Sequence, residues 1–152
     1  LKEEGLLERS IIYATDINPH SLDKAKKGIF SLERVRNYTA NYQASGGKQS
    51  FSDYYTAAYD GVIFDRSLIE NVSFADHSLA TDSVFSEMHL VCCRNVMIYF
   101  NHALQERALG LFYDSLCHRG FLGLGSKESI DFSSYARHFE PLVKSQRIYR
   151  KC

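Results

Sequence analysis

Short apolar runs separated by amphipathic segments fill the first part of the chain, a pattern typical of an α/β fold. Residues 10–15 are rich in β-branched and aromatic side chains and are followed by Asp16, so they predict a buried strand. Asn18 is a favourable helix N-cap, and Pro19 suits the first helical turn. A helix should therefore follow the strand and continue until Gly28. The order of strand, acidic residue and helix indicates an α/β domain.

The pattern weakens over residues 29–52, where we expect a short helix followed by a loop. Strand-like runs then return in quick succession. An Asp-Gly pair separates the first two runs, and a short turn precedes the third. The runs cover residues 54–59, 62–66 and 71–75. They predict a small antiparallel β-meander over residues 54–75, inserted within a larger domain.

The second half of the chain contains a nearly unbroken apolar run at residues 88–93, which is typical of a central parallel strand covered on both faces. Asn101 can cap a helix whose apolar residues recur at helical spacing, and Gly120 lies beyond the end of that helix. Residues 121–124 form the next expected strand. Weak alternation over residues 142–149 predicts a final pair of strands or one bent hairpin.

The composition is typical of one soluble globular domain. The chain has 152 residues, of which 45% are hydrophobic and 24% are charged, and this length can bury a core without disulfides or metals. Its 18 basic and 18 acidic residues balance, so we expect no surface for a nucleic-acid backbone. No apolar run approaches the roughly 20 residues that cross a bilayer, and the first residues lack the layout of a signal peptide. We therefore expect a cytoplasmic protein without nucleic-acid partners or membrane insertion.

Cysteine and histidine spacing gives no sign of a metal site. Cys92 and Cys93 are adjacent in an apolar run, whereas Cys117 and Cys152 stand alone, and no pair has CxxC spacing. The six histidines show no HxxxH or HxH pattern. We expect neither metal ligands nor disulfides, and we interpret the cysteines as buried thiols.

Polar residues follow two of the expected strands, at the sheet edge where ligands bind in open α/β folds. Asp16 could accept hydrogen bonds from the ribose hydroxyls of an adenosine cofactor, but an aspartate before Asn-Pro is also an ordinary turn residue. Arg94 and Asn95 could contact a ligand, but a polar pair is also expected where a buried strand emerges into a loop. Tyr99 lies in an apolar stretch, where a tyrosine more often belongs to the core than to a catalytic site. The pattern leaves both interpretations of each residue open.

Residues 93–100, with the sequence CRNVMIYF, closely resemble the motif of the chemotaxis receptor glutamate methyltransferase (CheR) family. Three further segments resemble that family in the same order, namely residues 14–18, 74–79 and 120–128. The resemblance covers nearly the whole chain, from about residue 11 to residue 149.

The resemblance implies a Rossmann-like methyltransferase fold. Family members have a helical amino-terminal domain followed by a Rossmann-like domain that carries a small antiparallel β-subdomain. Residues 1–152 would then be a partial methyltransferase domain, and residues 54–75 would be its β-subdomain. The chain would begin at the second strand of the sheet, without the first strand and its glycine-rich loop. In some members the subdomain docks the carboxyl-terminal peptide of a receptor by strand addition.

The resemblance also gives six residues a role in the site. They are Asp16 as the acid that binds ribose, Ser78 and Leu79 at the adenine end, Arg94 and Asn95 beside the methionine portion, and Tyr99 beside the methyl-transfer site as the catalytic residue. Ser78 departs from the family, which commonly has asparagine there. The implied cofactor is S-adenosyl-L-methionine, and the implied cofactor product is S-adenosyl-L-homocysteine.

The implied reaction transfers a methyl group to a glutamate carboxylate in the cytoplasmic region of a chemoreceptor or in a similar signalling protein. A glutamate of pKa about 4.3 is ionised at neutral pH, so alignment and exclusion of water take the place of general-base catalysis. Two alternatives stay open: a non-catalytic signalling interaction module, and a methyltransferase for another substrate. For the isolated 152-residue chain we expect weak cofactor binding, no appreciable activity, and self-association through an exposed sheet edge.

Overall fold

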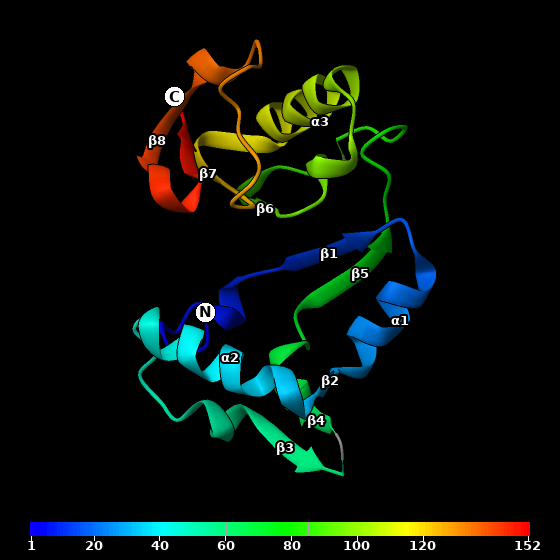
Figure 1. Cartoon of the computed structure of the whole chain (residues 1–152), viewed down its shortest axis with the longest axis vertical. Coiled ribbons are helices and arrows are strands. Elements are labelled where there is room, and N and C mark those ends of the chain that lie inside the picture. The colour runs from blue at the N-terminus through cyan, green and yellow to red at the C-terminus, as the bar shows by residue number, and fades with distance from the viewer. Residues whose placement is uncertain (60, 85) are drawn as a thin grey trace. The chain divides into compact units, whose positions relative to one another are not determined.

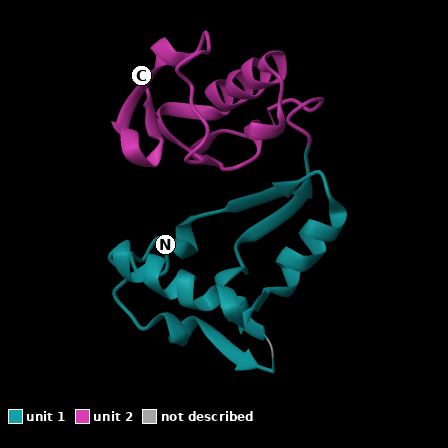
Figure 2. Cartoon of the chain, viewed as in Figure 1, with its two compact units in different colours: residues 1–77 teal, residues 78–152 magenta. Residues whose placement is uncertain are grey.

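The computed structural model describes residues 1–59, 61–84 and 86–152, which form two compact units. Unit 1 comprises residues 1–77 and unit 2 comprises residues 78–152 (Figure 2). Both units combine helices with strands, and each contains a parallel strand pair (Figure 1). The expected α/β class, of Rossmann-like type, is confirmed.

Unit 1 is built around two small sheets. Its helices and strands are β1 (Ile12–Asp16), α1 (Pro19–Lys27), β2 (Ile29–Ser31), α2 (Leu32–Ala44), β3 (Tyr55–Ala58), β4 (Gly61–Phe64) and β5 (Val72–Asp76), with 3-10 turns at Leu7–Arg9, Phe51–Tyr54 and Arg66–Leu68. β1 and β5 pair in parallel, with Ile12 opposite Val72 and Asp16 opposite Asp76. The carboxyl ends of the two strands therefore lie side by side.

Helix α1 begins and ends where its sequence predicts. The Asn18 side chain accepts a hydrogen bond from the backbone N–H of His20 at 2.9 Å, which satisfies a donor that the first helical turn cannot pair. Pro19 is the first helical residue. Gly28 ends the helix with a φ of 63°, a left-handed conformation that glycine adopts at little cost. Local signals therefore mark the start and the end of the helix that follows β1.

The expected β-meander over residues 54–75 is wrong in its third strand. β3 and β4 do form an antiparallel hairpin, but the third strand of that sheet is β2, whose Ile29 lies opposite Ile63. The third apolar run instead forms β5, which pairs with β1. The spacing of apolar runs indicates where strands form but not which strands pair, and β2 is separated from β4 in the sequence by helix α2.

Unit 2 is a four-stranded sheet with a long helix. Its elements are β6 (Met88–Cys93), α3 (His102–Ser115), β7 (Leu116–Leu124), β8 (Phe139–Val143) and β9 (Ile148–Lys151), with 3-10 turns at Met97–Tyr99, Ala136–His138 and Lys144–Gln146. The strand order is β6-β7-β9-β8, in which β6 is parallel to β7 and the other pairs are antiparallel. Asn101 caps α3 by accepting a hydrogen bond from the N–H of Leu104 at 3.0 Å, as expected. The expected final pair of strands is β8 and β9.

Strand β6 lies at an edge of this sheet rather than at its centre. In the described part of unit 2 its strand partner is β7, and its residue Leu90 is 57% exposed. The parallel pairing is confirmed, whereas the expectation that β6 is a central strand of the whole sheet, covered on both faces, stays a prediction. An apolar run indicates that a strand has faces to bury, and it does not specify which segments cover them. The core of unit 2 includes buried leucines of α3 and β7, among them Leu109 and Leu122.

Candidate functional site

Asp16 is the last residue of β1, and its side chain is exposed. Its Oδ1 atom accepts a hydrogen bond from the backbone N–H of Asn18 at 2.8 Å, so the turn into α1 orients the carboxylate. Asp76, to which the sequence assigned no role, lies opposite Asp16 in the parallel register and is also exposed. These two carboxylates give unit 1 an accessible acidic edge that can accept hydrogen bonds from ligand hydroxyl groups.

Ser78 and Leu79 open unit 2, and both are half-buried. The backbone N–H of Ser78 donates to the Asp82 side chain at 2.8 Å, and its carbonyl accepts from the N–H of Asp82 at 2.9 Å. The Ser78 hydroxyl accepts from the N–H of Ala80 at 3.3 Å. Leu79 packs against the hydrophobic core of unit 2. A local turn thus fixes the position of Ser78.

The loop after β6 carries Arg94 and Asn95, whose side chains are exposed. Asn95 has a φ of 60°, in the left-handed region that residues other than glycine seldom adopt. The buried carboxylate of Glu128 stabilises the backbone of this loop. It accepts hydrogen bonds from the backbone N–H groups of Asn95, Val96 and Met97 at 2.9, 2.9 and 2.7 Å. A buried acid therefore fixes the backbone of Asn95, which directly follows Arg94 in the chain.

Glu128 is a residue that the sequence reasoning missed. It is 4% exposed, and it also accepts a hydrogen bond from the N–H of Gly125 at 2.7 Å. The segment that resembles the CheR family, residues 120–128, ends at this glutamate, but nothing in it indicates which N–H groups the carboxylate meets. The sequence feature that indicates Glu128 is an acidic residue shortly after an apolar strand and a glycine. If such a residue is buried, its carboxylate needs hydrogen-bond partners.

Tyr99 ends the 3-10 turn after this loop, and 82% of it is exposed. Its interpretation as a core residue is therefore wrong. The side-chain amide of Gln105 donates to the carbonyls of Met97 and Phe100, each at 3.1 Å, which fixes the turn on both sides of Tyr99. The ring thus projects into solvent from a fixed backbone, and its place beside the methyl-transfer site stays a prediction.

The cysteines differ in their surroundings. Cys93 is buried, and burial raises the pKa of its thiol to about 12, with smaller contributions from the negative charge of Glu128 and from Cys92. Cys93 is therefore a neutral thiol at physiological pH. The expectation of buried thiols is wrong for Cys92 and Cys152, which are exposed, and all four cysteines are free.

The six residues assigned from the sequence are divided between the two units. Asp16 belongs to unit 1, and the others belong to unit 2. Within unit 2, Arg94, Asn95 and Tyr99 follow β6 in one continuous segment, in which Glu128 accepts from the N–H of Asn95 and Gln105 donates to the carbonyls of Met97 and Phe100. The residues expected beside the methionine portion and the one expected beside the methyl-transfer site therefore lie on one segment whose backbone is fixed.

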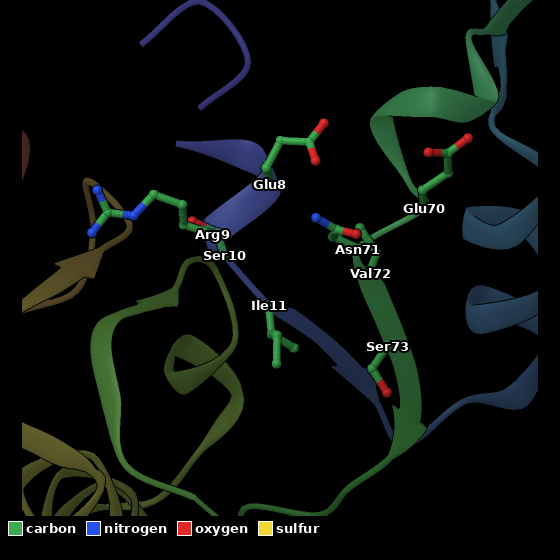
Figure 3. Close-up of a pocket in the computed structure, with 8 residues that line it drawn as sticks. All are labelled: Glu8, Arg9, Ser10, Ile11, Glu70, Asn71, Val72 and Ser73. Carbon is green, nitrogen blue, oxygen red and sulfur yellow. The ribbon is translucent and has the colours of Figure 1, made fainter. Parts of the chain in front are cut away.

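A surface hollow of about 540 Å³ lies in unit 1, at the amino ends of β1 and β5 (Figure 3). It is lined by Glu8, Arg9, Ser10, Ile11, Glu70, Asn71, Val72 and Ser73. Asp16 and Asp76 lie at the opposite ends of the same strands. The hollow contains none of the residues assigned to the site, and open α/β sheets bind ligands at the carboxyl ends of their strands.

Over residues 1–59, 61–84 and 86–152, no helix has both the length and the apolar character that crossing a bilayer requires. Over the same ranges, histidine, cysteine, aspartate and glutamate side chains form no group of three that could hold a metal ion.

Comparison with known proteins finds relatives along nearly the whole chain. Residues 2–147 match the family described as "CheR methyltransferase, SAM binding domain". The Pseudomonas putida protein Cher3 is 70% identical over 151 residues, which cover 99% of this chain and 55% of that protein. Chemotaxis protein methyltransferase 2 of Vibrio cholerae is 31% identical over 145 residues, which cover 91% of this chain and 47% of that protein.

The chemotaxis protein methyltransferase of Escherichia coli gives a similar result, with 31% identity over 144 residues, which cover 91% of this chain and 46% of that protein. The chain thus spans about half the length of these relatives, from 46% to 55%.

Proposed function

This chain belongs to the CheR methyltransferase family, and we propose that the whole protein methylates glutamate side chains of chemotaxis receptors or of similar signalling proteins. The domain that it matches binds S-adenosyl-L-methionine. One structural observation carries the proposal: the loop after β6 exposes Arg94, Asn95 and Tyr99 on a backbone held by Glu128. Relatives named as chemotaxis protein methyltransferases support the choice of receptor substrate.

The polar groups at the strand ends fit this cofactor. Ribose hydroxyls need hydrogen-bond acceptors, and Asp16 offers an exposed carboxylate that its turn orients. The methionine portion carries a carboxylate and an ammonium group, which the exposed side chains of Arg94 and Asn95 can bind. Ser78 and Leu79 would contact the adenine end.

When bound, S-adenosylmethionine supplies an electrophilic methyl group on its sulfonium centre. The exposed ring of Tyr99 would border the incoming glutamate side chain, orient its carboxylate and exclude water. No residue needs to act as a base, because the glutamate is ionised well below neutral pH, at a pKa of about 4.3. Cys93, with its pKa raised to about 12, stays protonated and takes no part. The rate should therefore vary little between about pH 6.5 and 8.

The proposal extends to the organisation of the chain. Residues 1–152 would form part of a methyltransferase domain, and the β2-β4-β3 sheet would be its β-subdomain, with bounds that differ from the expected 54–75. A substrate in the cytoplasmic region of a receptor requires the enzyme to act in the cytoplasm.

The test uses the full-length protein, S-adenosylmethionine labelled on its methyl group, and purified receptor cytoplasmic fragments. We expect label on the receptor fragment, released as methanol by mild alkali, because methyl esters hydrolyse under these conditions. Replacing the modified receptor glutamates with alanine should abolish the labelling. Cofactor binding without receptor labelling would indicate a methyltransferase for another substrate. A full-length protein that does not bind the cofactor would indicate a non-catalytic interaction module.

A further inference from the structure

Glu128 joins two loops that follow the neighbouring parallel strands β6 and β7. Its Oε1 atom accepts hydrogen bonds from the N–H groups of Val96 and Met97, and its Oε2 atom accepts from those of Asn95 and Gly125. All of these donors belong to the backbone. The carboxylate therefore fixes the path of the chain, and both of its oxygens are engaged.

The loop conformation depends on this anion. Three successive N–H groups, those of Asn95, Val96 and Met97, converge on one carboxylate, an arrangement that forms an anion-binding concavity. The left-handed φ of 60° at Asn95 is part of the same bend. Without a negative charge between them, the converging N–H dipoles would repel one another and the bend would relax.

Gly125 allows the two loops to approach this closely. A Cβ atom at this position would lie 2.6 Å from Oε2 of Glu128, 2.7 Å from Oδ1 of Asn95 and 2.8 Å from the Asn95 nitrogen. These distances are shorter than non-bonded atoms tolerate. Any larger residue would push the loop after β6 away from its position, even with Glu128 unchanged.

We propose that Glu128 is a positioning residue that holds the loop after β6 so that Arg94 and Asn95 can bind the cofactor and Tyr99 can border the substrate, an inference that rests on the function proposed above. A role in stability alone explains the site less well, because a buried charge seldom stabilises a fold more than an apolar side chain of similar size. The Glu128 side chain contacts the backbone of the loop after β6, and in this role it touches no reacting atom. It acts through the residues that the loop presents.

The first test is cofactor affinity in the full-length protein. Glu128→Gln keeps the size of the side chain but directs an NH₂ group at backbone N–H donors, so the dissociation constant for S-adenosylmethionine should rise by about tenfold or more. The matched control is Glu106→Gln, because Glu106 is a carboxylate of unit 2 that accepts hydrogen bonds from Ser134 at 3.0 and 2.6 Å. Its effect should stay within about twofold. Calorimetry at a temperature where each variant is folded gives both values.

Gly125→Ala is the second variant. It keeps the carboxylate and displaces the loop by steric contact, so it should raise the dissociation constant to a similar extent. If Glu128→Gln does not fold, Gly125→Ala decides whether the loop position controls affinity.

Amide hydrogen exchange gives a readout that needs no cofactor. In Glu128→Gln, the amides of Asn95, Val96 and Met97 should exchange about 100-fold faster, while the amide of Leu122 in β7 should keep its protection. An unchanged dissociation constant in both variants, or unchanged protection of the three amides, overturns the proposal. A wild-type protein that binds the cofactor and labels no receptor contradicts the proposed function alone, because the affinity and exchange results still decide the role of Glu128.

Discussion

Unit 1 and unit 2 each have a carboxylate near the carboxyl end of a parallel strand, and the surroundings of the two differ. Asp16, at the end of β1, is exposed, and its Oδ1 atom binds an N–H group of its own turn. Glu128, after β7, is 4% exposed and binds backbone N–H groups through both oxygens. An exposed carboxylate keeps capacity for a ligand, whereas a buried and fully paired one can only act on its own chain.

This difference predicts that experiments can distinguish the role of Asp16 from that of Glu128. Removing Asp16 should affect affinity and leave the fold intact. Removing Glu128 should affect the fold of the loop first and affinity as a consequence. Stability and binding measured on the same variants therefore distinguish the two roles.

The largest expected effect is on stability. Glu128→Ala leaves backbone N–H donors without their acceptor and creates a cavity, so it should lower the free energy of unfolding of the full-length protein by about 3 kcal/mol or more. Asp16→Ala, at an exposed turn, should cost about 1 kcal/mol or less. Urea denaturation followed by circular dichroism gives both values. Equal losses in the two variants would contradict the distinction.

The next effect is on binding. Asp16→Ala in the full-length protein should weaken S-adenosylmethionine binding by about 1.5 to 3 kcal/mol, the range for hydrogen bonds to a charged group. The reason is that the exposed carboxylate at the end of β1 can accept from ribose hydroxyls. Calorimetric titration measures the change. A dissociation constant equal to that of the wild type would remove Asp16 from the cofactor site.

A smaller effect separates the backbone of Asn95 from its side chain. Glycine adopts the φ of 60° at this position without strain, so Asn95→Gly should change stability by less than about 0.5 kcal/mol, whereas Asn95→Ala should cost about 1 kcal/mol. Both variants should bind the cofactor more weakly than the wild type, because both lose the side-chain amide. If only Asn95→Ala loses affinity, the backbone conformation matters and the side chain does not contact the cofactor.

Features encoded by neighbouring residues could be predicted from the sequence. Helix α1 was found because its cap at Asn18, its proline at position 19 and its terminal Gly28 act locally. Local chemistry is therefore enough to place this helix. The candidate residues on the loop after β6 are identified by the resemblance of residues 93–100 to the CheR family, because the local pattern leaves two interpretations of each residue open.

Features that depend on distant partners could not be predicted. The pairing of β5 with β1 follows from tertiary contacts, and the spacing of apolar runs contains no information about it. The role of Glu128 depends on the N–H group of Asn95, 33 residues earlier in the chain. The pattern left open whether Tyr99 is a core or a site residue for a similar reason, because an apolar neighbourhood in sequence does not determine which face a short 3-10 turn buries.

The smallest expected effect concerns a third carboxylate, Glu3 in unit 1. It is half-buried, and so lies between the exposed Asp16 and the buried Glu128. Hydrogen bonds from the hydroxyls of Tyr42 and Tyr54, and from the backbone N–H of Lys48, lower its pKa from 4.5 to about 2. Because the folded-state pKa is depressed, the stabilisation is fully present above pH about 4.5 and is lost as the pH falls toward 2. The difference in thermal midpoint between wild type and Glu3→Gln should therefore shrink over this window. Tyr54→Phe removes one of the donors, so the pH range over which this stabilisation is lost should become narrower. A difference in thermal midpoint between wild type and Glu3→Gln that is equally large at pH 5 and pH 2 would show that these hydrogen bonds do not favour the ionised form of Glu3.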